Sequence, residues 1–145
     1  YPDRKEELET MRHNSDDTMG PPNPVISPAD ILRGRKLIQE VYIDEKIEKY
    51  ILDIVFATRN PKQFGLTKIA DLISYGASPR ATINLAIGAK AMAFIKRRGY
   101  VIPEDVRAIC LDVLRHRVAV TYEAEAEDIT SENIIQEILN KVVVP

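Results

Sequence analysis

The stretch "SPRATINLAIGAKAMAFIKRRG", residues 78–99, predicts one long helix that is apolar on nearly every side. A helix that is apolar all round is typical of the buried centre of a bundle. Ser78 and Pro79 suit its N-cap and first position, and Gly99 suits its C-terminal cap. Its apolar residues are Ile83, Leu85, Ala86, Ile87, Ala89, Met92, Ala93, Phe94 and Ile95.

Helix signals also precede this stretch. Ser27 and Pro28, followed by Asp30, come close to a capping box and predict a helix from residue 28 to about Val41. Asp44 suits the cap of the next helix, "EKIEKYILDIVFATR". That segment has an apolar face at helical spacing, which we expect to be buried. The face consists of Ile47, Ile51, Ile54 and Val55.

The C-terminal half adds two more helices and some strand. "IPEDVRAICLDVLRH" has Pro103 at a first helical position, followed by two acidic residues, and "TSENIIQEILNKV" is amphipathic. "RVAVTYEAE", residues 117–125, alternates and predicts a short strand, whereas "LTKIADLISYG" fits a short helix or a strand. The predicted fold class is mainly α, a helical bundle with a little strand.

The first residues form a separate region. Residues 1–13 suggest a short amphipathic helix with Leu8 and Met11 on one side. A polar stretch with Gly20 and three prolines follows. We therefore predict a domain division into residues 1–19, a linker at 20–27 and a helical domain at 28–145. Because the chain begins with Tyr1, we expect it to be a piece of a longer protein.

Composition narrows the classes of function. The 145 residues carry 20 Lys and Arg against 22 Asp and Glu, a net charge of −2, which gives no electrostatic argument for nucleic acid or an acidic membrane. Cys110 is the single cysteine, so an intrachain disulfide is excluded and a cytoplasmic location is expected. No uninterrupted apolar run approaches the roughly 20 residues that span a bilayer.

Motifs of catalysis are absent from the sequence. It has neither G-x-x-x-x-G-K-[ST] nor G-x-G-x-x-G, the glycine-rich loops that hold phosphates. His13 and His116 are far apart and lack zinc-ligand spacing. We expect Cys110 to be a buried, inert thiol, the acidic run 123–128 to be a solvated strand end and loop, and the chain to contain no catalytic or metal-binding residue.

Arg80 is the exception, because a cation is unfavourable in the first turn of a helix. One interpretation is a solvated charge or a salt bridge to Asp112 or Glu104. The other is an anion site, in which the helix start at Ser78 and Pro79 places backbone N–H groups beside the guanidinium. The basic runs 96–98 and 115–117 fit a solvated helix end and a helix C-cap respectively, with contact to a partner or phosphate as the alternative for 115–117.

The motifs "GASPRA", "RGYVIPEDV" and "VLRHRV" resemble the C-terminal part of MoxR-type AAA+ ATPases. "YPDRKEELETM" resembles the end of that family's α/β core, and "VYIDEKIEKYILDIVFATR" resembles the second helix of its lid. The resemblance covers nearly the whole chain in order. It implies a lid domain of four or five helices with a short strand pair that closes over a nucleotide held by an upstream core.

The resemblance also implies site residues and partners. Arg80 matches the sensor 2 arginine, which contacts the γ-phosphate of ATP, with Ser78 and Pro79 positioning it. The parent protein would use ATP and Mg²⁺, form ring oligomers and remodel or assemble protein complexes, sometimes with von Willebrand factor A domain proteins. The fragment itself lacks the P-loop and Walker B acids, so it should neither bind nucleotide firmly nor hydrolyse ATP.

One residue departs from the family pattern, and two other functions remain open. Ile102 stands where the family usually has Thr or Ser, which removes a helix cap and should cost about 1 kcal/mol. The alternatives are a helical protein-interaction module and a nucleic-acid-binding module using the two basic runs, both without a nucleotide role.

Overall fold

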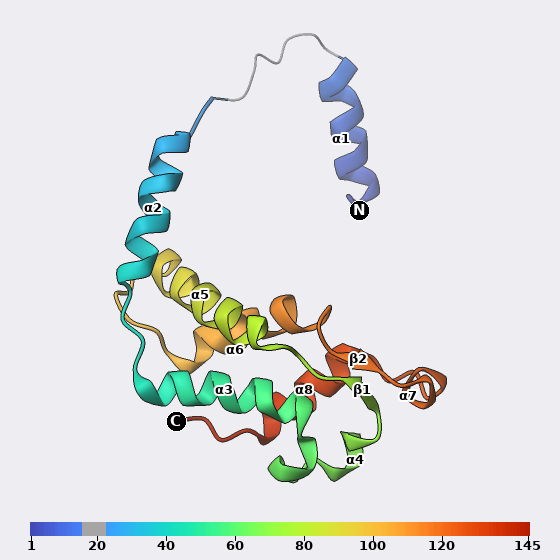
Figure 1. Ribbon diagram of the computed structural model, residues 1–145. Coiled ribbons are helices and arrows are strands. Elements are labelled where there is room, and N and C mark those ends of the chain that lie inside the picture. The colour runs from blue at the N-terminus through green and yellow to red at the C-terminus, as the bar shows by residue number, and fades with distance from the viewer. Residues whose placement is uncertain (16–22) are drawn as a thin grey trace. The chain divides into compact units, whose positions relative to one another are not determined.

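The computed structural model describes residues 1–15 and 23–145 (Figure 1). These residues divide into two compact units, Tyr1–Leu32 and Arg33–Pro145. Each unit is described by itself. Over these residues the fold is mainly α with one pair of short strands, which confirms the predicted class. The elements are α1 (Arg4–Ser15), α2 (Pro28–Glu40), α3 (Glu45–Arg59), η1 (Pro61–Phe64), α4 (Thr67–Ala70), β1 (Ile73–Tyr75), α5 (Pro79–Ile95), α6 (Pro103–Leu114), β2 (Ala119–Val120), α7 (Tyr122–Ala126) and α8 (Ser131–Lys141).

The first unit contains α1 and the first residues of α2. The carboxylate of Asp3 caps α1 by accepting hydrogen bonds from the backbone N–H groups of Lys5 and Glu6, both at 2.8 Å. Leu8 and Met11 are exposed on α1. The predicted helix is therefore confirmed, whereas the predicted linker falls partly on residues 16–22, outside the described residues.

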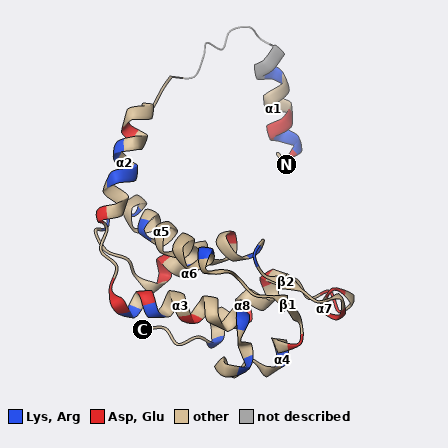
Figure 2. Cartoon of the chain, in the orientation of Figure 1, with Lys and Arg blue, Asp and Glu red and all other residues tan. Residues whose placement is uncertain are grey.

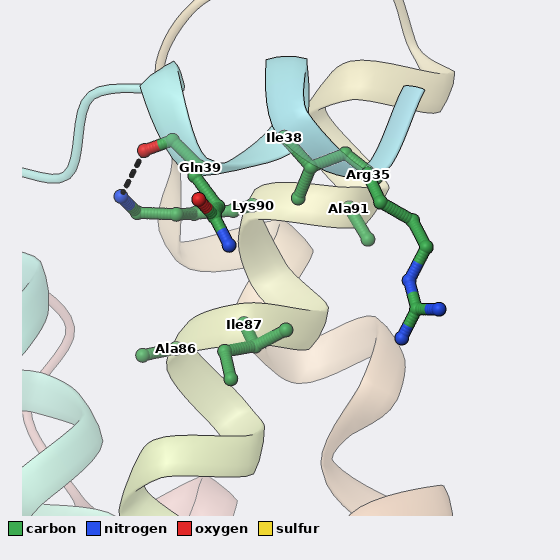
Figure 3. A pocket seen from close by; sticks show the side chains of 7 residues that line it. All are labelled: Arg35, Ile38, Gln39, Ala86, Ile87, Lys90 and Ala91. Carbon is green, nitrogen blue, oxygen red and sulfur yellow. Dashed lines mark hydrogen bonds between the residues drawn. The ribbon is translucent and has the colours of Figure 1, made fainter. Parts of the chain in front are cut away.

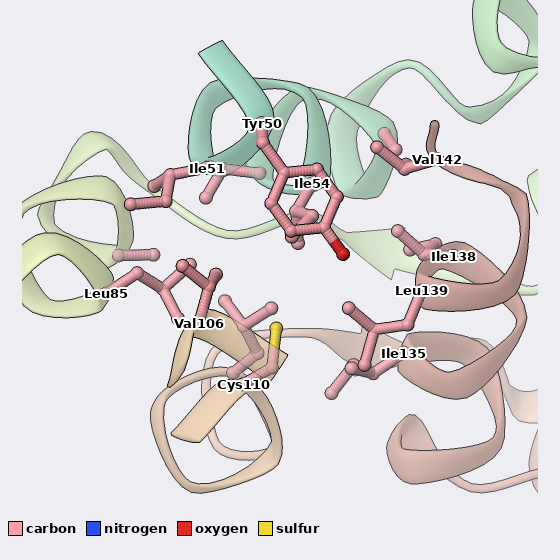
Figure 4. Close-up of a cluster of buried hydrophobic side chains, with 14 of the residues drawn as sticks. Tyr50, Ile51, Ile54, Leu85, Val106, Cys110, Ile135, Ile138, Leu139 and Val142 are labelled. Carbon is pink, nitrogen blue, oxygen red and sulfur yellow. The ribbon is translucent and has the colours of Figure 1, made fainter. Parts of the chain in front are cut away.

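In the second unit α3, α5, α6 and α8 pack around one core (Figure 4). Tyr50, Ile54, Val106 and Ile138 come from three of these helices and are almost fully buried. The four residues predicted for the apolar face of α3 are all buried, and Asp44 accepts a hydrogen bond from the backbone N–H of Lys46 at 2.9 Å. Periodicity and cap chemistry therefore located α3 correctly.

The prediction that α5 is buried on nearly every side is wrong. Its buried residues are Ala81, Leu85, Ala89 and Ala93, which recur every fourth position and form one stripe. α5 packs against α6 and α3, and a stripe made mostly of alanine allows helices to approach closely. The larger residues point away from the core: Ile83, Ile87 and Ile95 are 58%, 57% and 70% exposed.

α5 ends at a left-handed residue, and that residue is Arg97 instead of the predicted Gly99. Arg97 has φ 59°, its N–H donates to Phe94 O at 2.8 Å, and the N–H of Arg98 donates to Ala93 O at 2.9 Å. These two bonds form a Schellman motif. Gly99 instead accepts a hydrogen bond through its carbonyl from the backbone N–H of Tyr42 at 2.9 Å.

The basic run 96–98 is not simply a solvated helix end. Arg98 Nη2 and Lys96 Nζ lie 2.6 Å and 3.2 Å from Asp105 Oδ1, and the Asp105 side chain is fully buried. Asp105 Oδ2 accepts a hydrogen bond from the backbone N–H of Ile102 at 3.1 Å. Ile102 supplies no side-chain cap, as expected, but this carboxylate satisfies its N–H and ties α5 to α6.

The strands are shorter than predicted. β1 and β2 pair antiparallel, with Ile73 opposite Val120, and the chain then turns into α7. Thr121 ends the strand because its hydroxyl accepts a hydrogen bond from the backbone N–H of Ala124 at 3.3 Å. Residues 123–126, expected at a strand end and loop, are therefore helical. The ambiguous segment 66–76 contains both a helix, α4, and a strand, β1.

Candidate functional site

Arg80 is the second residue of α5, and its side chain is exposed. Within the part of the chain that the structure describes, it forms no hydrogen bond or ion pair. The proposed salt bridge to Asp112 or Glu104 is absent, and Asp112 instead binds Arg115 at 3.0 Å. The first turn of α5 contains no acidic residue. The guanidinium therefore stands without a counter-charge at the positive end of a helix.

The start of α5 differs from the start of α2, although both begin with Ser-Pro. At α2 the Ser27 hydroxyl accepts from the backbone N–H of Asp30 at 3.1 Å, and the Asp30 carboxylate accepts from the Ser27 backbone N–H at 3.2 Å. Ser78 makes no side-chain cap hydrogen bond, and the alanine at the third helical position, Ala81, has no side chain that could bond back to the Ser78 N–H. Ser78 is the N-cap residue and Pro79 the first helical residue, as predicted, but of the two serines only Ser27 caps its helix through the side chain.

Part of the expected backbone anion site is already occupied. The N–H of Ala81 donates to the carbonyl of Ser78 at 2.8 Å, and Pro79 has no N–H. An anion at this helix start would therefore be held chiefly by the Arg80 guanidinium. An exposed, unpaired arginine suits a phosphate, since its planar fork can donate two parallel hydrogen bonds to phosphate oxygens.

Within the basic run 115–117, Arg115 acts as a structural cap. Arg115 donates to the Leu111 carbonyl at 3.2 Å, and it also forms an ion pair with Glu132. His116 is exposed. Arg117 is half-buried, and its Nε is enclosed without a hydrogen-bond partner in the described part of the chain. The capping interpretation is confirmed for Arg115.

The remaining side chains with possible chemistry are the potential metal ligands and Cys110. No group of three or more potential metal ligands comes together within residues 1–15 and 23–145. Cys110 is fully buried as predicted, and burial raises the pKa of its thiol to about 12, which disfavours the reactive thiolate. No helix in the described part is long and apolar enough to cross a membrane.

The outer face of α5 lines an open hollow of about 440 Å³ beside α2 (Figure 3). Ile38, Ala86 and Ile87 are among its apolar residues, with Arg35 and Lys90 at its rim. Lys90 donates to the carbonyl of Gln39 at 3.1 Å, which links the two helices. Sequence reasoning missed this surface because it placed the whole helix inside the bundle.

Charges of both signs are interspersed along the elements of the second unit (Figure 2). Three of the six residues in the two basic runs, Lys96, Arg98 and Arg115, are bound by carboxylates of the chain itself. This pairing removes much of the basic surface that a nucleic-acid-binding module would need.

Comparison with known proteins identifies one family model and several relatives. The model of the "AAA lid domain" family matches residues 66–138. Chaperone MoxR1 of Mycobacterium tuberculosis is 35% identical over 147 residues, covering 100% of this chain and 38% of its own length. Protein MoxR of Paracoccus denitrificans is 37% identical over 87 residues, covering 56% of this chain and 26% of its own length.

A solved structure agrees with these relatives. The crystal structure of a candidate ATPase from Cytophaga hutchinsonii is 46% identical and superposes with a TM-score of 0.94, covering 100% of this chain and 44% of its own length. The chain thus spans less than half the length of each of these relatives. The resemblance to MoxR-type proteins is confirmed: the chain belongs to the AAA lid domain family and is homologous to the MoxR proteins.

Proposed function

We propose that this lid closes over ATP held by a nucleotide-binding core outside the chain, and that Arg80 is its sensor 2 arginine. The observation that carries the proposal is the exposed Arg80 guanidinium, unpaired within the described residues, at the start of α5. Such a group has its counter-charge supplied by another molecule or domain. Membership of the AAA lid family makes ATP on an AAA+ core the natural source of that charge.

The contribution of Arg80 is electrostatic. The resting lid carries a cation at a helix N-terminus, which costs about 0.3–1 kcal/mol. A phosphate brought within hydrogen-bond distance reverses that cost. Mg²⁺-bound ATP would supply the phosphoryl group and the leaving group, and a guanidinium placed on its oxygens stabilises negative charge in the transition state. Arg80 moves no proton and forms no covalent bond.

The same side of α5 offers a surface for the core. Arg80, Ile83 and Ile87 are spaced by three and four residues, so they share one face of the helix. Ile83 and Ile87 are more than half exposed. We propose that the domain that presents the phosphate to Arg80 also covers these two isoleucines, so that the nucleotide and the apolar contact favour the same closed position.

For the whole protein we propose ATP-driven remodelling or assembly of protein complexes by a ring oligomer, with the domain division at residues 19 and 27 as predicted. The name of the Mycobacterium tuberculosis relative, Chaperone MoxR1, supports the chaperone class. Partnership with von Willebrand factor A domain proteins and a cytoplasmic location belong to the same proposal.

A second candidate is a protein-interaction module without a nucleotide role. The exposed apolar face of α5 favours it, because surfaces of this kind mark contact sites. It predicts that substitution of Arg80 leaves ATP-dependent behaviour unchanged while substitution of Ile87 weakens a partner contact.

The deciding experiment is steady-state ATP hydrolysis by the full-length protein, wild type against Arg80→Ala. We expect turnover to fall about tenfold or more, which is the order of effect for a lost transition-state charge contact. Arg80→Lys should recover only part of the rate, because lysine cannot donate in a bidentate fork. Lys36→Ala, at an exposed basic residue of α2 outside the hollow, is the control and should be near wild type. Normal turnover in a folded Arg80→Ala protein would refute the sensor role.

A further inference from the structure

A buried hydroxyl on α3 is the main polar contact that reaches the segment leading into α5. Thr58 lies in the last turn of α3 and is 1% exposed. Its Oγ1 donates to the carbonyl of Val55 at 2.6 Å and accepts from the backbone N–H of Ala77 at 2.9 Å. Ala77 is itself fully buried and stands three residues before Arg80.

The Thr58 hydroxyl acts both as a hydrogen-bond donor and as a hydrogen-bond acceptor, and each role has one partner. Because its hydrogen points to the Val55 carbonyl, a lone pair is left facing the Ala77 N–H. The bond spans 19 positions of the sequence, so it is not a local turn. It links the end of α3 to the entry of α5, with only Ser78 and Pro79 between the anchored residue and Arg80.

Gly76 makes this close approach possible. A Cβ placed on Gly76 would lie 2.5 Å from the Thr58 carbonyl oxygen and 2.7 Å from Arg59 Cγ. The first neighbour is backbone and cannot swing aside, so a side chain at position 76 would force the two segments apart. Two neighbouring contacts therefore join the segments: Gly76 lies against the Thr58 backbone carbonyl, and the Ala77 N–H binds the Thr58 hydroxyl. We call them together the α3–α5 latch (Thr58, Gly76 and Ala77).

We propose that Thr58 is a positioning residue for Arg80. Through the α3–α5 latch Thr58 fixes where α5 begins, and this sets the position from which the Arg80 side chain extends. The inference rests on the proposed function, since it assigns Thr58 a role in the use of Arg80. Ser78 makes no side-chain cap, so the local sequence fixes the helix start only through Pro79 and the backbone bond from the Ala81 N–H to the Ser78 carbonyl. The Thr58 hydroxyl supplies the constraint from a different helix, and Thr58 itself touches no phosphate.

The test uses turnover, KM for ATP and thermal unfolding of the full-length protein. Thr58→Val removes the hydroxyl at nearly constant volume, and we expect kcat to fall about fivefold or more with little change in KM, because misplacement of a contact group by about 1 Å costs up to 10² in rate. Thr58→Ser keeps the hydroxyl and should restore most of the rate. Gly76→Ala places a Cβ against the Thr58 carbonyl and separates the two segments of the latch, so it should lower kcat as Thr58→Val does. Thr67→Val, at an exposed threonine outside the latch, is the control.

A double-mutant comparison separates positioning from general loss of structure. In an Arg80→Ala background, Thr58→Val should lower turnover no further, because the group that it positions is gone. An equal loss of turnover in both backgrounds, or wild-type turnover in folded Thr58→Val, would overturn the inference while leaving the proposed role of Arg80 intact. If Arg80→Ala alone has no effect, the proposed function fails first, and this inference fails with it.

Discussion

The two ends of α5 use arginine in opposite ways. At the C-terminal end, Arg98 lies 2.6 Å from the buried carboxylate of Asp105, and Lys96 joins it at 3.2 Å. At the N-terminal end, Arg80 is exposed and has no carboxylate within the described residues. The charge of Arg98 is neutralised inside the fold, where it joins α5 to α6. The charge of Arg80 remains available to a group outside the described residues.

The comparison shows how function can be separated from stability along one helix. A cation near a helix C-terminus is favourable, and a cation in the first turn is not. A half-buried arginine that is paired with a buried carboxylate at the favourable end needs no explanation beyond structure. An unpaired arginine at the unfavourable end calls for a ligand, and this contrast makes Arg80 the stronger candidate for function.

The largest effect on stability should come from removing the carboxylate that binds the basic residues at the C-terminal end of α5. Asp105→Ala removes the carboxylate and leaves the Ile102 N–H and the Arg98 guanidinium without their partner. Because Arg98 and Lys96 keep some access to water, we expect a loss of about 2–3 kcal/mol in the free energy of unfolding, at the low end for a broken buried pair. Urea unfolding of the 145-residue chain measures it.

A matched control for Asp105→Ala is Asp112→Ala. Asp112 also binds an arginine, Arg115, but the Asp112 side chain is 75% exposed. Exposed pairs contribute little, so the loss should stay below about 1 kcal/mol. Equal losses for the two variants would mean that burial does not distinguish the paired end of α5 from an ordinary surface ion pair.

The second prediction concerns the loss of stability at acidic pH. Burial by itself would raise the pKa of Asp105, but the hydrogen bonds from Arg98, from the Ile102 backbone N–H and from Lys96 outweigh it and lower that pKa below its ordinary value. A carboxyl with a lowered folded-state pKa stabilises the fold fully above its unfolded-state pKa, about 3.9 for Asp. This contribution is lost as the pH falls below that value and through the folded-state pKa.

The measurement is urea unfolding at pH 6 and pH 3 for wild type and Asp105→Asn. Wild type should lose more stability on acidification than the variant, because the variant has no carboxyl to protonate at this position. The difference between the two proteins should therefore shrink as the pH falls. A difference that stays constant from pH 6 to pH 3 would contradict the assignment of a lowered pKa to Asp105.

Local sequence signals predicted α3 better than α5. Asp44 and the apolar face of α3 were recognised because cap chemistry and helical spacing are both local. The burial of α5 was misjudged because composition alone cannot say which side of an apolar helix meets its neighbours, and alanines, not isoleucines, formed the contact stripe.

Local sequence patterns also missed two other features: the left-handed residue after α5 and a hydrogen bond between distant positions. Arg97 was overlooked as the left-handed residue because Gly99, two positions later, is the more usual choice. The hydrogen bond from Ala77 to Thr58 joins positions 19 apart, and no local pattern marks it. Arg80 itself was predictable, because a cation in the first turn of a helix is an anomaly that the sequence displays directly.

The smallest expected effect tests the unpaired end, and it has the opposite sign. Arg80→Gln removes the unfavourable cation, and Arg80→Glu adds a favourable anion at the same place. The free energy of unfolding of the 145-residue chain should therefore rise in the order wild type, Gln, Glu, by about 0.3–1 kcal/mol in total. The gain should shrink in high salt, because the site is exposed. ATP turnover of the full-length protein should fall in both variants, so stability and activity would move in opposite directions. A Glu variant less stable than wild type would show that Arg80 is satisfied within the folded chain, and the contrast between the two ends of α5 would then be lost.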